Sequence, residues 1–140
     1  MVFHGPTSQT GAYAQRPVLS AQTRARLDSA AWADILADHW APQMYLYTRD
    51  AGTGADLRVR MFAPAMGVAE DPATGAGAAA VAVVLAGEGS GRWVVEQGIE
   101  MGRPSRLELE ADAGSGGVER VRLGGAAVRV SSGEMEIPEG

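Results

Sequence analysis

Two adjacent carboxylates, Glu70 and Asp71, stand directly before a proline, a threonine and a glycine that lead into the apolar run Ala76–Ala86. This order is typical of a loop that delivers an acid to the start of a buried helix. The first turn of a helix carries unpaired backbone N–H groups and the positive end of the helix dipole, and both attract a carboxylate or a phosphate. The chemistry that these residues offer is therefore anion binding by the helix start, with Asp71 beside it.

The same residues also have a purely structural interpretation. Asp71 can cap the helix and Pro72 can occupy its first position. Gly75 and Gly77 lie in or next to the first turn, where each glycine costs about 1 kcal/mol relative to alanine. Glycine is tolerated at such a place when another backbone or a ligand must come close. The glycines therefore indicate either a bound ligand or close packing against strands.

Composition excludes several classes of function. The chain has 140 residues, of which 46% are hydrophobic, a size and composition suited to one globular domain. Its net charge of −5 disfavours nucleic acids and anionic membranes as partners, since both require basic patches. The sequence contains no cysteine, and its two histidines, His4 and His39, lie far apart. We therefore expect neither a disulfide nor a metal site.

No targeting or membrane-spanning segment is recognisable in the sequence. The residues that follow Met1 lack a basic region followed by an apolar one, the pattern of a secretory signal. The run Ala76–Ala86 is far shorter than the roughly 20 residues that cross a bilayer. We expect a cytoplasmic protein that does not bind membranes.

The region before Pro42 is expected to contribute little to the core. Residues 1–27 begin with a stretch rich in Gly, Ser, Thr and Gln, which indicates a loop or a poorly ordered tail. Asp28 predicts the N-cap of a helix from Ser29 to about His39. One face of that helix carries an apolar stripe that we expect to pack against the protein, namely Trp32, Ile35, Leu36, His39 and Trp40. Because Pro42 stops this element, residues 28–41 form a helix and its connection.

Residues 42–140 form the main domain, in which alternating apolar and polar residues predict short strands. The expected strands are residues 44–47, 57–62, 92–96, 106–111, 118–123 and 126–131, with a last edge strand at 134–137. Turns are expected at 50–54, 114–117 and 124–125. A helix that is apolar on every side must be surrounded on every side. The pattern therefore predicts an α+β fold, in which a curved, mostly antiparallel sheet or barrel wraps around the central helix Ala76–Ala86.

Three stretches of the chain resemble the phenazine-biosynthesis PhzF-like family: Arg60–Pro64, Gly67–Gly75 and Gln97–Ser105. The second of them follows the family motif G-x-x-E-D-P-A-T-G-S-A, and Val121–Gly133 adds a further similarity. The resemblance implies a diaminopimelate-epimerase-like fold with two similar halves, each a barrel around a helix, and a site in the cleft between them. It runs from Pro42 to Ile137 and covers only the C-terminal half of a family member.

The family's reaction is a cofactor-free isomerisation that moves a proton within a small carboxylic acid, a dihydro-hydroxyanthranilate. The resemblance implies that Asp71 is the acid that assists proton transfer or orients the substrate, and that the backbone N–H groups of Gly75 and Ala76 hold the substrate carboxylate. The full set of expected substrate-binding residues is Thr74, Gly75, Ala76, Gln97, Gly98 and Arg103. For Arg103, an ion pair with Glu100 or Glu108 is the structural alternative.

The chain departs from the family in two ways. Ala76 stands where the family has serine, so one hydroxyl is missing while the backbone N–H remains. The family's catalytic glutamate belongs to the N-terminal half, and no segment of this chain matches that half. We therefore expect an isomerase half that pairs with a second copy of itself or with a separate N-terminal half. The alternatives are a non-catalytic carboxylate-binding or scaffold protein and a truncated gene product.

Overall fold

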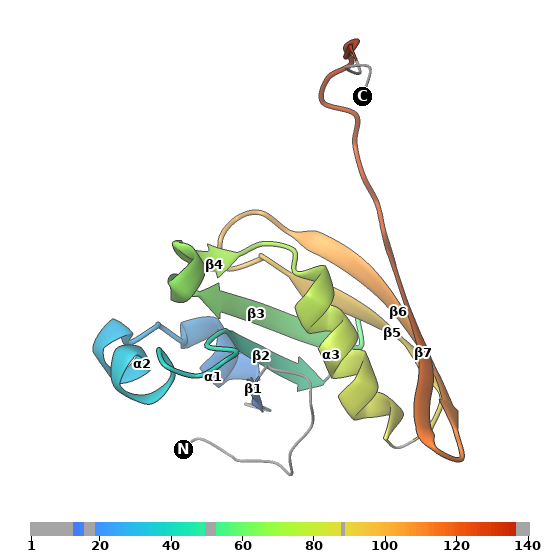
Figure 1. Cartoon of the computed structure of the whole chain (residues 1–140), viewed down its shortest axis with the longest axis horizontal. Helices are drawn as coiled ribbons and strands as arrows, with labels where there is room; N and C mark the ends of the chain where they lie inside the picture. Colours follow the sequence, from blue (N-terminus) through green and yellow to red (C-terminus); the bar gives the residue numbers. More distant parts are fainter. Residues whose placement is uncertain (1–12, 16–18, 50–52, 88, 137–140) are drawn as a thin grey trace.

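Seven strands and three α-helices make up the computed structural model, which describes residues 13–15, 19–49, 53–87 and 89–136. In chain order the elements are β1 (Tyr13–Gln15), α1 (Leu19–Arg24), α2 (Ser29–Ile35), β2 (Met44–Arg49), β3 (Leu57–Ala63), the 3-10 turn η1 (Pro64–Met66), β4 (Val68–Asp71), α3 (Gly75–Ala86), β5 (Gly91–Gln97), β6 (Ser105–Gly114) and β7 (Gly117–Gly125). Figure 1 shows the strands in one curved sheet, with α3 lying across one of its faces. The α+β fold predicted from the sequence is confirmed.

The sheet has the strand order β1-β2-β3-β5-β6-β7, and β4 pairs with β3 outside this row. Strands β2 and β3 form one antiparallel pair, and β5, β6 and β7 form an antiparallel meander. These two groups are joined by a parallel pairing of β3 with β5 that is only three residue pairs long and ends at Val59 and Gln97. A parallel pairing needs a long crossover connection, and α3 lies in that connection. Within the described chain the outer strands β1 and β7 do not pair with each other, so the sheet does not close into a barrel.

Helix α3 buries one face against the sheet and leaves the other partly open. Its buried face consists of Gly77, Ala78, Val81, Ala82, Leu85 and Ala86. These side chains pack against the core residues of the strands, which include Tyr45, Tyr47, Leu57, Val59, Val95 and Leu109. Ala76 is exposed and Val84 is 44% exposed on the opposite side. The expectation that the helix is enclosed on every side is therefore wrong for this chain, because an open sheet covers only one of its faces.

The segment expected to be a loop or tail contains, in its described part, strand β1 and helix α1. Strand β1 runs parallel to β2 at one edge of the sheet. In α1, the side chain of Gln22 is fully buried, and its Nε2 donates to the carbonyl oxygens of Leu46, at 3.2 Å, and Arg58, at 2.9 Å. The Thr48 hydroxyl donates to Gln22 Oε1 at 2.8 Å. A polar anchor of this kind has no apolar periodicity, which explains why the sequence pattern did not indicate it.

Helix α2 is shorter than its predicted range and ends at Ile35 rather than near His39. Its predicted cap is confirmed, because Asp28 Oδ1 accepts the N–H groups of two residues in the first turn. Of the predicted apolar stripe only Leu36 is buried, while Trp40 is 76% exposed and His39 is exposed. The stripe requires helical spacing throughout, and the chain leaves the helix before its last members. None of the described helices is long and apolar enough to cross a membrane.

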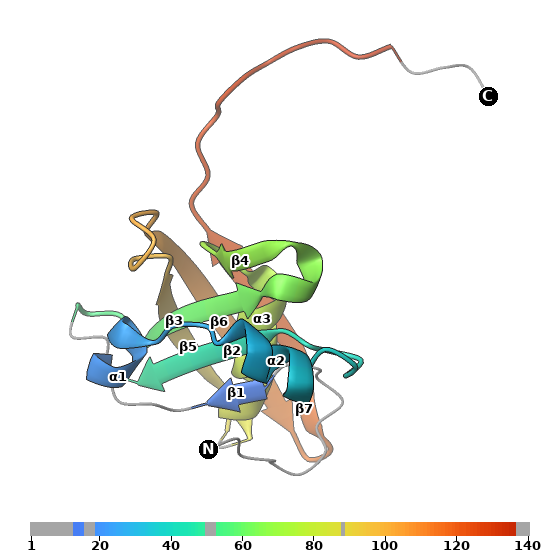
Figure 2. The same cartoon turned by 90° about the vertical axis from the view of Figure 1, so that its left-hand side faces the viewer.

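The chain beyond β7 carries no strand in its described part. Residues 126–136 were expected to hold one strand and the beginning of another, yet they are exposed and extend away from the sheet, as Figures 1 and 2 show. Val128 and Val130 are 84% and 90% exposed. Alternation produces a strand only where a neighbouring edge offers hydrogen bonds, and no described strand lies beside this segment. Gly124 and Gly125 likewise end β7 instead of forming the predicted turn, and residue 137 lies outside the described residues.

Candidate functional site

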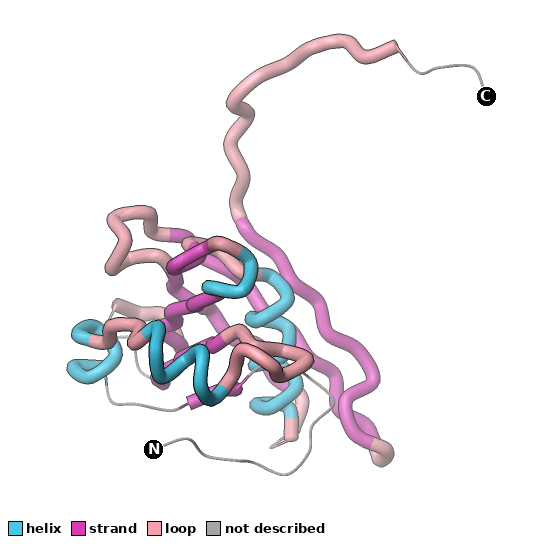
Figure 3. The backbone as a smooth tube through the Cα atoms, turned by 60° about the vertical axis from the view of Figure 1, so that its left-hand side comes forward, coloured by secondary structure: helices cyan, strands magenta, loops and turns pink. Residues whose placement is uncertain are grey.

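The predicted acidic loop is a short strand followed by a tight entry into α3. Strand β4 pairs with β3, with Asp71 opposite Met61, and the N-cap of α3 is Thr74. Asp71 is therefore the last residue of a strand, and the proposed N-cap role for Asp71 with Pro72 at the first helical position is wrong. Pairing with β3 keeps Asp71 extended, so the helix begins only after Thr74. Figure 3 shows how β4 leads through this short connection into α3.

Glu70 and Asp71 have different environments although they are neighbours. The Glu70 carboxylate accepts two hydrogen bonds from Arg60, one from Nε and one from an Nη atom, each 2.8 Å long. Arg60 is 4% exposed, and its other terminal nitrogen donates to the carbonyl oxygens of Gln22 at 3.0 Å and Ala25 at 2.8 Å. Glu70 thus ties β4 to β3 and, through Arg60, to α1. Asp71 makes no ion pair with any described residue.

The Asp71 side chain is held by the N-cap residue of α3. Asp71 is half-buried, and its Oδ2 accepts a hydrogen bond of 2.5 Å from the Thr74 hydroxyl. The Thr74 hydroxyl therefore binds the carboxylate rather than capping a backbone N–H of the first turn. The first helical hydrogen bond of α3 joins the Ala78 N–H to the Thr74 carbonyl, so the N–H groups of Gly75, Ala76 and Gly77 precede the helical ladder. An acid and backbone N–H groups that precede the first helical hydrogen bond therefore occur together at the start of α3.

Gln97, the last residue of β5, lies beneath this helix start. Its side chain is fully buried. The Nε2 atom donates to the Asp71 carbonyl at 2.7 Å and to the Thr74 hydroxyl oxygen at 2.8 Å. The Oε1 atom accepts from the Thr74 N–H at 3.2 Å and from the Tyr45 hydroxyl at 3.3 Å. One amide therefore connects the end of β4, the start of α3 and strand β2.

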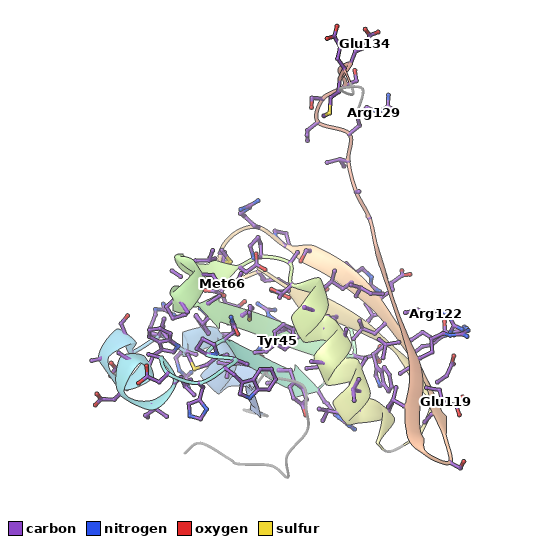
Figure 4. All side chains as sticks on the ribbon, viewed as in Figure 1. Tyr45, Met66, Glu119, Arg122, Arg129 and Glu134 are labelled. Carbon is purple, nitrogen blue, oxygen red and sulfur yellow. The ribbon has the colours of Figure 1, made fainter. Side chains whose placement is uncertain are left out.

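Tyr45 is part of this network, although sequence reasoning assigned it only to a strand. Its side chain is fully buried, and Figure 4 shows it on the sheet beside α3. Burial raises the pKa of the Tyr45 hydroxyl above its usual value, and the charge of Asp71 raises it further. A Cβ atom at Gly77 would lie 2.5 Å from the Tyr45 ring. Gly77 therefore permits close packing of α3 on Tyr45, and a glycine in the first turns of an otherwise apolar helix is the signal that could have indicated a close contact there.

The loop after Gln97 packs against the connection between β4 and α3. Gly98 has φ +77°, and a Cβ atom there would collide with the Arg103 carbonyl and lie 2.9 Å from the Pro72 carbonyl oxygen. The Ser105 hydroxyl donates to the Pro72 carbonyl at 2.5 Å. Gly98 is buried, whereas the Arg103 side chain is exposed. The two loops therefore form one packed unit around Pro72.

The ion pair considered as the structural alternative for Arg103 is absent from the described part of the chain. Glu100 pairs with Arg58 at 3.0 Å instead, and Glu108 is exposed on β6. At the start of α3, Ala76 is exposed, and a Cβ atom at Gly75 would lie 2.8 Å from Leu123 of β7. Of the sequence-predicted site residues, Asp71, Thr74 and Gln97 are hydrogen-bonded to one another. Gly75 and Ala76 adjoin them in α3, Gly98 lies in the supporting loop, and no described contact links the Arg103 side chain to them.

Comparison with known proteins gives consistent results. The family described as "Phenazine biosynthesis-like protein" matches residues 17–133. An uncharacterized isomerase of Mesorhizobium japonicum is 38% identical over 128 residues, which are 85% of this chain and 42% of the relative. The trans-2,3-dihydro-3-hydroxyanthranilate isomerase of Pseudomonas aeruginosa is 43% identical over 94 residues, 64% of this chain and 31% of that protein.

Similarity extends to a solved structure, that of a Bacillus anthracis phenazine biosynthesis protein of the PhzF family. It superposes with a TM-score of 0.63 at 16% sequence identity, over 80% of this chain and 40% of that one, and at this identity the likeness shows the fold. This chain spans less than half the length of these relatives.

Proposed function

Because the chain belongs to the phenazine biosynthesis-like protein family, we propose that it forms the C-terminal half of a PhzF-like isomerase. Such an enzyme moves a proton within a small carboxylic acid without a cofactor. The relatives support this class, since they are named isomerases. The share of their length that the chain spans supports the assignment to one half.

The observation that carries the proposal is the hydrogen-bonded pair of Asp71 and Thr74 at the start of α3. A carboxyl group held in one orientation can give or take a proton at a substrate atom placed against it. The N–H groups of Gly75 and Ala76 lie at the positive end of the helix dipole and would hold the carboxylate of the substrate. Fixed N–H dipoles of this kind stabilise the negative charge that develops during proton abstraction.

The second catalytic group would come from the complementary half, either a second copy of this chain or a separate N-terminal half. A proton shift within a substrate is assisted by a base and an acid placed around it, and among the described residues of the site Asp71 is the group proposed for one of these roles. The partly open face of α3 supports a complementary half, since Ala76 is exposed and Val84 is 44% exposed there. Contiguous exposed apolar patches often mark surfaces that a partner covers.

Native mass measurement and proton exchange at carbon test this proposal together. The chain is incubated in deuterated water with small cyclic or aromatic carboxylates, including a dihydro-hydroxyanthranilate, alone and with the N-terminal half of a family member. We expect a dimer or a mixed complex and deuterium incorporation into the ligand. A strictly monomeric, folded chain that shows no exchange in either mixture would overturn it.

A non-catalytic carboxylate-binding protein is the second candidate. Ala76 favours it, because the family's serine hydroxyl is missing at the helix start while the backbone N–H groups remain. Calorimetric titration with the same carboxylates separates the two functions. Binding without deuterium incorporation identifies the binding protein, and binding with incorporation identifies the isomerase.

A further inference from the structure

We infer that Gln97 is a positioning residue that fixes the direction of the hydrogen bond between Thr74 and Asp71. Because Thr74 then donates to Oδ2, Asp71 exchanges its proton through Oδ1. The catalytic meaning of this order rests on the proposed function. The order of the hydrogen bonds is a property of the folded chain and can be tested without turnover.

The orientation of the Gln97 amide is fixed by two backbone groups. The Asp71 carbonyl can only accept a hydrogen bond, and it lies 2.7 Å from Nε2. The Thr74 N–H can only donate, and its nitrogen lies 3.2 Å from Oε1. A flipped amide would place two acceptors against each other and two donors against each other. Backbone partners therefore determine which end of the side chain carries the hydrogens.

That orientation determines the direction of the next hydrogen bond. The second hydrogen on Gln97 Nε2 points to the Thr74 hydroxyl oxygen at 2.8 Å, so this oxygen acts as an acceptor. The hydroxyl proton of Thr74 is then left to donate to Asp71 Oδ2 at 2.5 Å. A carboxyl oxygen that carries a proton is a poorer acceptor than a bare one, so this hydrogen bond to Oδ2 favours Oδ1 as the position of any proton on Asp71. Such hydrogen bonds to a charged oxygen are stronger than those between neutral groups.

The remaining acceptor position of the Gln97 amide is occupied by the Tyr45 hydroxyl. Oε1 of Gln97 is an acceptor, so the Tyr45 hydroxyl must donate to it at 3.3 Å. A tyrosine hydroxyl is protonated at neutral pH, and burial raises the pKa of Tyr45 further above that range. All four hydrogen-bonding positions of Gln97 are thus occupied, and the side chain is fully buried. Gln97 therefore acts on the site through Thr74 rather than by touching a ligand.

Asp71 is left with one oxygen for chemistry. Among the described residues, none donates a hydrogen bond to Oδ1, whereas Oδ2 is engaged by Thr74. When Asp71 carries a proton, that proton sits on Oδ1, and when it accepts one, Oδ1 receives it. The substrate atom that exchanges the proton must therefore lie against Oδ1.

NMR spectroscopy of the unmodified chain tests the hydrogen-bond order directly. We expect scalar coupling from the Gln97 side-chain nitrogen to the Asp71 carbonyl carbon and a slowly exchanging Thr74 hydroxyl proton. In Gln97→Met, which keeps the length but removes the amide, the Thr74 amide and hydroxyl protons should exchange roughly fivefold faster or more, as expected from loss of a hydrogen bond. In the control Ser105→Ala, which removes the hydrogen bonds to the backbone carbonyls of Pro72 and Gln97 but leaves the Gln97 amide in place, both should stay slow. Absence of the coupling in the unmodified chain, or unchanged exchange in Gln97→Met, would overturn the inference.

The effect of this hydrogen-bond direction on catalysis is measured separately, by comparing kcat and KM of variants at Gln97 and Thr74. In the assembled enzyme, Gln97→Met and Thr74→Val should lower kcat roughly tenfold or more with little change in KM, because orientation of the acid is lost. Thr74→Ser keeps the hydroxyl and should restore most of the rate. If no preparation turns over, the proposed function fails while the NMR result still decides the hydrogen-bond order. If Thr74→Val is as fast as Thr74→Ser, the positioning role is wrong.

Discussion

The guanidinium of Arg60 and the carboxylate of Glu70 face each other through two hydrogen bonds of equal length, 2.8 Å. The pair joins a residue of β3 to a residue of β4, so it holds in place the strand that ends at Asp71. Planar two-point pairs of this kind add geometric precision to their energy. Glu70 therefore serves the architecture of the site and leaves its neighbour available for chemistry.

Glu70→Ala should lower the free energy of unfolding by about 3–5 kcal/mol, because it leaves a buried guanidinium without its counter-charge. Arg60 is 4% and Glu70 14% exposed, so solvent screens the pair little. Urea denaturation measures the change. As a matched control, Glu110→Ala breaks two exposed pairs, one with Arg92, which is 80% exposed, and one with Arg122, which is 44% exposed, and should cost about 1 kcal/mol at most. Equal losses in the two variants would contradict a structural role for Glu70.

Asp71→Asn should lower kcat of the assembled isomerase by roughly 10²-fold or more, the usual contribution of a general acid or base. Substrate affinity should change little, because the helix N–H groups remain. Steady-state kinetics and calorimetric titration measure the two quantities. Asp34→Asn changes an exposed acid on α2 and provides the control for loss of one charge. Unchanged turnover in Asp71→Asn would remove Asp71 from the mechanism.

The buried tyrosine of the network predicts a loss of stability in alkali. The pKa of Tyr45 is raised in the folded state, so above the ordinary value of about 10 the unfolded chain releases this proton while the folded chain retains it. Stability is fully present below that pH and falls by up to about 1.4 kcal/mol per pH unit above it. Tyr45→Phe removes this slope. Denaturant titrations at several pH values from about 9 to about 11 measure the free energy of unfolding of both proteins, and the loss should begin at about pH 10. The same dependence on pH in Tyr45→Phe and in the unmodified chain would contradict the prediction.

Gly98→Ala should destabilise the chain by about 1–3 kcal/mol or more, because alanine must adopt a positive φ and its methyl group meets two carbonyl groups. Gly102 is the matched control. Its φ is +69°, but a methyl group there would meet no atom within 4 Å, so Gly102→Ala should cost only about 1 kcal/mol. Thermal denaturation compares them. Similar losses would show that the contact with Pro72 is unimportant.

Regular elements could be predicted from the sequence where a single chain segment determines them. The apolar run gave the position of α3, and alternation gave the strands of the two antiparallel groups. The cap of α3 was misassigned, because pairing of Asp71 with β3 depends on a residue that is distant in sequence. The enclosure of α3 was overestimated for a related reason, since alternation does not reveal whether a sheet closes.

Polar contacts were the part of the site that patterns could not reveal. Gln97 was predicted as a site residue, but its partners are backbone groups and hydroxyls from other strands and loops, brought together only by the fold. Gln22 and Tyr45 escaped notice for the same reason. A buried amide or hydroxyl is placed by hydrogen bonds, and these leave no periodic trace in the sequence.

The parallel pairing of β3 with β5, the β3–β5 seam, is three residue pairs long and also has a consequence for the order of folding. The β2–β3 and β6–β7 pairs close short loops and can form early, whereas the seam must close the long connection that contains α3. Gln97 is the last residue of that seam, so we expect its hydrogen bonds to appear only in the final docking step. Pulse-labelling hydrogen exchange during refolding would show β6 protected before the Thr74 amide, and the reverse order would contradict this. We therefore expect the hydrogen-bonded group of Asp71, Thr74 and Gln97 to form last, after the antiparallel strand pairs have assembled.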